Sequence, residues 1–126
     1  MRKTFLLLAV GLLFAAVTAL PVLPANAQST VVTDDNLDQA LANAKTPADH
    51  EAIAAYYDKE AADNEAKAKL HHAVHHDYEK FHLKPPDMAN HCNELAKSFE
   101  RAARLDKDLA AEHHAMAKKL AAKSGS

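Results

Sequence analysis

The sequence predicts an all-α protein, an antiparallel hairpin of two long helices with a short helix before it. Glycine occurs only at Gly11 and Gly125, alanine and charged residues are abundant, and the alternation of a half-buried strand is absent. Two long stretches without a helix breaker are separated by Pro85-Pro86. A turn is expected there, because a residue before proline avoids helical geometry. A short turn between long helices makes them antiparallel neighbours.

The N-terminal segment 1–27 has the features of a secretory signal peptide. Arg2 and Lys3 precede an apolar run from Phe5 to Leu20, and an A-x-A cleavage motif ends at Ala27. We expect cleavage after Ala27 and therefore a periplasmic or secreted protein. The alternative, an uncleaved membrane anchor, is disfavoured because the run is short for a full span. No membrane span is expected after cleavage.

The part that follows, residues 28–126, is acidic. It has 13 basic side chains, which are the 15 of the whole chain without Arg2 and Lys3, against 17 acidic ones, so its net charge is −4. This balance offers no basic face for nucleic acid. All nine histidines lie in this part. Histidine titrates near pH 6.5, so mild acid would change the surface charge strongly.

Residues 28–45 are expected to form a leader and a short helix. Thr33 is a suitable N-cap, and acidic residues follow it where negative charge suits the helix dipole. From Leu37 onward, apolar residues recur at i, i+3, i+4 and i+7 up to Ala44, which is typical of an amphipathic helix. This helix would either dock on the hairpin or fray.

The hairpin is predicted to span residues 46–123, with a tail at 124–126. Thr46, Pro47 and Asp49 form a strong helix start, with a capping residue, a proline in the first turn and a capping-box acid. The first long helix would run to about Phe81, and the second from about residue 86 to about Ala122. The expected core stripes are Ile53, Tyr56, Tyr57, Ala61, Ala66, Leu70, Val74, Tyr78 and Phe81, then Met88, Cys92, Leu95, Phe99, Ala102, Leu109, Met116 and Leu120. Two alanine-rich helices bury little surface, so docking of the short helix or a homodimeric four-helix bundle is expected.

The two long helices resemble each other, which suggests an internal duplication. When the run that begins at His71-His72 is aligned with the run at His113-His114, Tyr57 aligns with Phe99. His50 aligns with His91 if the second half carries one extra residue. Antiparallel pairing would bring His50 near His113 and His114 at the open end, and Cys92 near the histidines at the turn end.

The histidines at the turn end are candidate metal ligands. Histidines at i, i+3 and i+4 share one helix face within reach of a single ion, and a thiolate beside imidazoles suits copper, zinc or nickel. The predicted turn-end site comprises His71, His72, His75, His76, His91 and Cys92. A second, weaker cluster at the open end comprises His50, His113 and His114.

A second interpretation needs no metal. Seam histidines can pair with tyrosines or carboxylates and respond to pH, as in an envelope interaction or stress protein. The single cysteine would then be buried in the seam or would link two copies through a disulfide. An enzyme is not expected, because two alanine-lined helices without a glycine loop provide no oxyanion site for Cys92.

Short motifs resemble a group of small, uncharacterised exported bacterial proteins. They are Asp49-His50, Tyr56-Tyr57, His71, His91-Cys92-x-x-Leu95-Ala96, Glu112-His113 and Met116-Ala117. The resemblance covers about residues 46–119. It implies an alanine-rich helical hairpin in the cell envelope and brings no activity with it.

Overall fold

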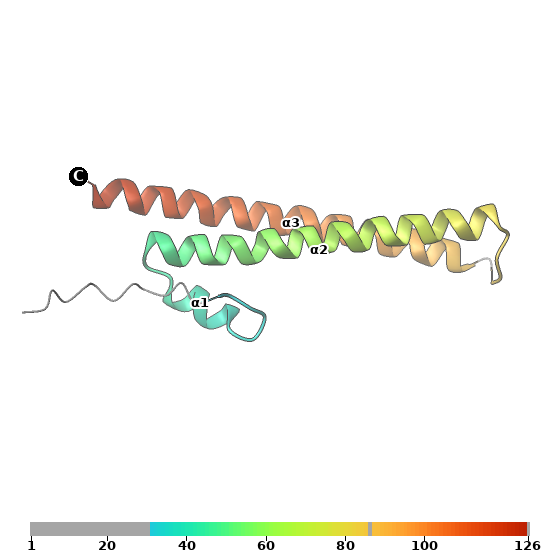
Figure 1. Ribbon diagram of the computed structural model, residues 1–126, viewed down its shortest axis with the longest axis horizontal. Helices are drawn as coiled ribbons and strands as arrows, with labels where there is room; N and C mark the ends of the chain where they lie inside the picture. Colours follow the sequence, from blue (N-terminus) through green and yellow to red (C-terminus); the bar gives the residue numbers. More distant parts are fainter. Residues whose placement is uncertain (1–30, 86, 126) are drawn as a thin grey trace, which may run out of the picture.

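The computed structural model describes residues 31–85 and 87–125, which form three helices and no strand (Figure 1). These are α1 (Leu37–Asn43), α2 (Pro47–Lys80) and α3 (Asp87–Ser124). The two long helices pack antiparallel along their length, and α1 contacts α2 near the open end, far from the turn. The predicted all-α hairpin with a short preceding helix is therefore confirmed. Within the described ranges, no helix has an apolar stretch long enough to cross a bilayer.

The start of α2 follows the predicted capping box. The backbone N–H of Asp49 donates to Thr46 Oγ1 (3.2 Å), and the backbone N–H of Thr46 donates to Asp49 Oδ2 (2.8 Å). The start of α1 differs from the prediction, which put the cap at Thr33. There the Thr33 N–H donates to Asn36 Oδ1 (2.8 Å), and the helix begins only at Leu37. An asparagine side chain that binds nearby backbone favours a turn over a helix, which explains the later start.

The seam between α2 and α3 is built on alanines spaced by one heptad. The buried alanines of this row are Ala54, Ala61 and Ala68 in α2, and Ala96, Ala103, Ala110 and Ala117 in α3. A heptad repeat keeps one row facing the partner helix, as in a coiled coil. Methyl side chains allow two helix backbones to approach closely. The alanine row therefore sets both the register and the spacing of the hairpin.

A second heptad row lies beside the alanines and is mixed in character. In α2 it contains His50, Tyr57, Asn64, His71 and Tyr78, and in α3 it contains Cys92, Phe99, Asp106, His113 and Leu120. Several of these residues contact the opposite helix, among them His50 with His113 and Asn64 with Asp106.

The predicted core stripes were partly wrong. Several of the large apolar residues assigned to them are exposed, including Leu70 (60%), Phe81 (58%) and Leu95 (45%). Ala54 and Ala68, which the predicted stripes omit, are buried. The reason is geometric: when the alanine row faces the partner, residues one or two positions along the helix turn well away from the seam.

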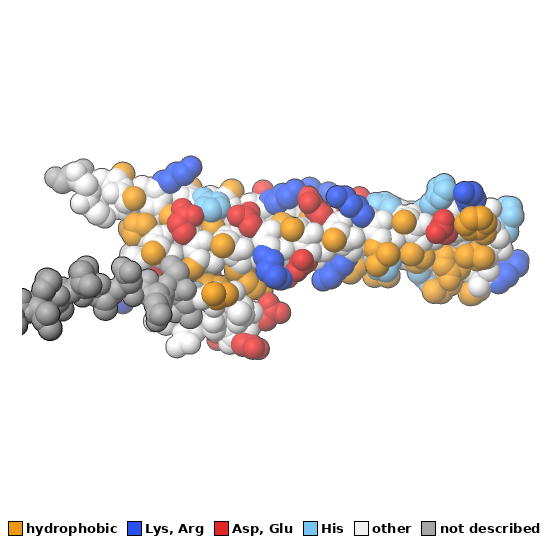
Figure 2. Space-filling model, viewed as in Figure 1, with side chains coloured by type: hydrophobic (Ala, Val, Ile, Leu, Met, Phe, Trp, Pro, Cys, Tyr) orange, Lys and Arg blue, Asp and Glu red, His pale blue; other side chains and the backbone are white. Residues whose placement is uncertain are grey.

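The hairpin has a polar side and an apolar side next to the seam. The polar side is the row that forms cross-helix ion pairs: Glu51, Asp58, Glu65, His72, Glu100, Lys107 and His114. The helical repeat puts a row of exposed or half-buried apolar residues on the opposite flank. This apolar side comprises Leu70, Val74, Phe81, Met88, Leu95, Leu105, Leu109 and Met116. Figure 2 shows hydrophobic side chains gathered over the turn end of the hairpin.

Among the described residues, the leader lies against α2 near the open end of the hairpin. Ile53 of α2 is fully buried, and the Tyr56 hydroxyl, from the next turn of the helix, donates to Asp34 Oδ1 (2.8 Å). This bond to a carboxylate raises the pKa of Tyr56 to about 12. Lys45, the last residue before the cap of α2, also donates its backbone N–H to Asp49 Oδ2 (3.0 Å), so the leader is joined to α2 by polar contacts at both ends.

Candidate functional site

Two histidines meet across the seam at the open end, as antiparallel pairing predicted. His50 lies in the first turns of α2 and His113 in α3, and their Nδ1 atoms are 3.0 Å apart. One ring N–H donates to the lone pair of the other ring. His113 is buried, and its ring stacks on Tyr57 with centroids 6.0 Å apart. Burial, and secondly the neighbouring His50, lower the pKa of His113.

The adjacent histidine, His114, binds two carboxylates on the polar side. Its Nδ1 lies 2.7 Å from Glu51 Oε2 and its Nε2 lies 3.2 Å from Asp58 Oδ2. Both ring nitrogens can donate at once only when the imidazole is protonated. The bond to Asp58, followed by the bond to Glu51, accordingly raises the pKa of His114.

The histidines at the turn end have separate partners. His72 Nε2 donates to Glu100 Oε1 (2.8 Å), which lowers the pKa of that carboxyl. His75 Nδ1 donates to the carbonyl oxygen of Ala89 (2.9 Å). His71 stacks on Phe99 with ring centroids 5.5 Å apart. Its Nδ1 is buried and has no hydrogen-bond partner among the residues that the structure describes.

The rest of the predicted turn-end site is dispersed. His76 is largely exposed, with its Nδ1 3.9 Å from Asp77 Oδ1, and His91 is also exposed. Cys92 is a free thiol buried in the seam, with 7% of its surface exposed. Within residues 31–85 and 87–125, no group of three or more His, Cys, Asp or Glu side chains is arranged to hold a metal ion. The structure thus brings His50 and His113 together but does not gather the six residues at the turn end.

The contacts at the two ends correspond in the register that aligns His71 with His113. The stack of Tyr57 on His113 corresponds to the stack of Phe99 on His71. The bond between Asp58 and His114 corresponds to that between Glu100 and His72. This register needs no extra residue, so the counterpart of His50 is Cys92, and the pairing of His50 with His91 in the sequence alignment was wrong.

Two polar contacts at the middle of the seam were missed from the sequence. Asn64 Nδ2 donates to Asp106 Oδ2 (2.9 Å), and Lys107 pairs with Glu65. In both pairs the residues are 42 positions apart. The shift of 42 positions that aligns the two halves would have predicted both pairs. Near the centre of such a hairpin, a residue of the first helix faces the residue that is aligned with it in the second helix.

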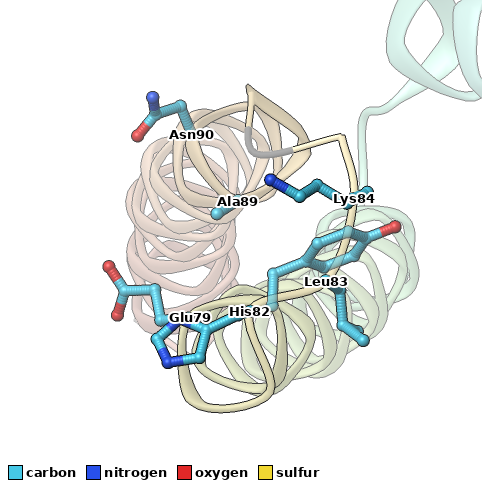
Figure 3. A pocket seen from close by; sticks show the side chains of 7 residues that line it. Glu79, His82, Leu83, Lys84, Ala89 and Asn90 are labelled. Atoms are coloured by element: carbon cyan, nitrogen blue, oxygen red, sulfur yellow. The ribbon is translucent and has the colours of Figure 1, made fainter.

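A shallow hollow of about 300 Å³ lies beside the turn (Figure 3). Its lining residues are Tyr78, Glu79, His82, Leu83, Lys84, Ala89 and Asn90. The labelled side chains in Figure 3 come from the end of α2, the loop and the start of α3. Among these lining residues there is neither a nucleophile activated by a base nor a convergent set of ligands, so the hollow indicates no chemistry.

No protein-family model matches the chain, and neither a curated protein nor a solved structure is significantly similar to it. The geometry of the hairpin is therefore the basis for inferring its function.

Proposed function

We propose that the protein is a non-enzymatic, exported interaction module that pairs with a second copy of itself through its apolar side. The observation that carries the proposal is the exposure of large apolar residues on one flank of the hairpin. Leu105, for example, is 63% exposed, and Leu109 and Met116 of the same helix are exposed as well. On α3 this surface runs at heptad spacing through Met88, Leu95, Ala102, Leu109 and Met116, whereas on α2 Glu60 and Lys67 lie between Ile53 and Val74. A patch of large exposed apolar residues marks an interaction site.

The polar side is a poor candidate for this interface. Glu51, Asp58 and Glu100 already pair with histidines across the seam, and Lys107 already pairs with Glu65. Burying satisfied charges at an interface removes their hydration without adding a partner. Association through the apolar side leaves these pairs in water.

A second copy is the occupant that suits the apolar side best. The flank is formed by two antiparallel helices, so two copies facing each other form a four-helix bundle in which the apolar residues of α3 meet those of the other copy. Such a contact is isologous, because the same surface serves on both copies. It also explains how a hairpin with a core mostly of alanine reaches adequate stability, since small domains bury a small fraction of their surface.

The apolar side is buried at Ile53 near the open end and exposed at the turn end, and this difference indicates where the second copy would bind. Ile53 at the open end, where α1 contacts α2, is fully buried, whereas its counterpart in the second half, Leu95, is 45% exposed. The leader therefore occupies the open end, and the second copy would cover the middle and the turn end. Leu70, Phe81 and Met88 lie there.

An internal duplication and export are also proposed for this chain. The matching contacts at the two ends, in the register that aligns His71 with His113, support the duplication. Export to the periplasm or the medium is proposed from the expected signal peptide, which lies outside the described residues. Because Cys92 is buried in the seam, the proposed dimer relies on apolar contact and not on a disulfide.

Sedimentation equilibrium of the exported protein, purified without a tag, tests the proposal. We expect a concentration-dependent dimer for the parent and a monomer for Leu105→Glu, since a charge at this exposed position would oppose association without entering the seam. The matched control is Lys107→Glu, two positions along the same helix but on the polar side, which should still dimerise. A parent protein that stays monomeric, or equal weakening by both substitutions, would refute the proposal.

A further inference from the structure

The histidine pair at the open end lies in the seam and plays no part in the proposed dimer contact. His50 and His113 come from different helices, yet their Nδ1 atoms lie 3.0 Å apart at a partly buried point. Of the acids near the pair, Glu51 and Asp58 are engaged by His114, and Asp49 is engaged in the cap of α2.

The separation of the two nitrogens suits a shared ion. Nitrogens bound about 2.0 Å from one ion lie about 2.8 Å apart in adjacent positions of a square and about 3.3 Å apart in a tetrahedron. The observed distance lies between these values. An ion could therefore replace the hydrogen bond with little movement of either helix.

The surroundings hold both rings in place. The capping box of Thr46 and Asp49 fixes the first turn of α2, which carries His50. His113 is packed against Tyr57 in the seam. Ligands held in advance by packing and capping lose little freedom when they bind.

We propose that His50 and His113 bind one copper(II) ion through their Nδ1 atoms, with solvent completing the coordination. Nitrogen ligands in adjacent positions suit a tetragonal ion, and copper(II) is bound more strongly than nickel or zinc by a given set of imidazoles. Two protein ligands leave positions open, so the site suits exchangeable binding of the ion better than permanent storage. It lies at the end of the hairpin opposite to the turn-end cluster that the sequence had favoured.

A competing source of copper affinity must be separated from this site. His72 and His76 lie one turn apart on α2 with side chains 45% and 70% exposed. Exposed histidines at this spacing also bind transition metals. Their double replacement, His72→Gln with His76→Gln, is therefore the control.

The test is a copper(II) titration of the full, untagged protein against a competing chelator, with electron paramagnetic resonance of the bound ion. We expect one equivalent bound, nitrogen hyperfine coupling from two imidazoles, and an affinity at least about tenfold lower in His50→Gln. His113→Gln should give the same loss, with circular dichroism to verify that both variants keep their helix content.

The double control should bind copper as the parent does. Unchanged affinity in His50→Gln, a loss in only one of the two seam variants, or a loss confined to the double control would overturn the proposal. None of these readouts depends on whether the protein dimerises.

Discussion

Asn64 Nδ2 donates a hydrogen bond to Asp106 Oδ2 (2.9 Å) at the centre of the seam, beside the alanine row. The two residues are counterparts in the two helices, 42 positions apart. A polar pair in an apolar seam favours one register over its neighbours, because any slip of one helix leaves both groups without a partner.

Removing one member of this pair should destabilise the hairpin. Asn64→Ala leaves the partly buried Asp106 carboxylate without its donor, and we expect a loss of about 1–3 kcal/mol in the free energy of unfolding. Urea denaturation followed by circular dichroism measures it. The control is Asp63→Ala, which removes only a surface pair with Lys59 and should cost about 0–1 kcal/mol. Equal effects would mean that the Asn64 contact adds nothing to stability.

The alanine row should not tolerate larger side chains. Ala61 is buried in the seam and its neighbour Ala62 is exposed on the same helix. Ala61→Leu should destabilise the protein by about 1–3 kcal/mol, because the added atoms push the helices apart. Ala62→Leu should have little effect, as leucine and alanine have similar helix propensities. Thermal unfolding of the two variants compares them, and a stable Ala61→Leu protein would show that the helices are not closely packed there.

The pKa values of the two neighbouring histidines of α3 should lie on opposite sides of the usual histidine value of about 6.5. The pKa of His113 is lowered, chiefly by burial, and that of His114 is raised, chiefly by its bond to Asp58. Carbon-detected NMR of the metal-free protein, with a chelator present, should therefore find His113 titrating at the lower pH. The reverse order would contradict the geometry of the open end.

These shifts have opposite consequences for stability. The stability linked to His113 is present above pH 6.5 and is lost as pH falls through its lowered folded-state pKa. The stability linked to His114 is present below pH 6.5 and is lost as pH rises through its raised folded-state pKa. His114→Gln should therefore lower the free energy of unfolding at acidic pH and leave it unchanged at alkaline pH. His113→Gln should make the free energy of unfolding fall less as the pH is lowered. Urea denaturation over a range of pH measures both effects, and the contribution of His114 should be small because its side chain is 40% exposed to solvent.

The thiol of Cys92 should react slowly in the folded protein. It lies in the seam with 7% of its surface exposed, so labelling requires the helices to separate locally. We expect labelling by a thiol reagent to be at least about 100-fold slower than in the urea-unfolded protein. Rapid native-state labelling would mean that the turn end opens readily, and it would favour the disulfide-linked dimer instead.

Much of the fold followed from local signals. Thr46 and Asp49 predicted the start of α2, and the proline pair predicted the turn, because both depend only on neighbouring residues. The meeting of His50 with His113 followed from antiparallel pairing alone. These inferences needed no knowledge of how the two helices pack.

The packing itself was not predicted, because alanine gives a weak signal. Leu70 and Phe81 are more hydrophobic than Ala54 and Ala68, so an apolar stripe was drawn through the wrong residues. The partner of His72, Glu100, was missed for the same reason. A cross-helix contact can be assigned only once the row that faces the seam is known, and the strict heptad spacing of the alanines is the pattern that identifies it.

The distance between two copies tests the central proposal most directly. In a Cys92→Ala background, a spin label is placed by Leu105→Cys on the apolar side or by Lys107→Cys on the polar side, and pulsed dipolar spectroscopy measures the separation between copies. The proposed bundle predicts a short, well-defined distance for position 105 and a longer one for position 107. A shorter distance for position 107, or no coupling between copies at either position, would contradict pairing through the apolar side.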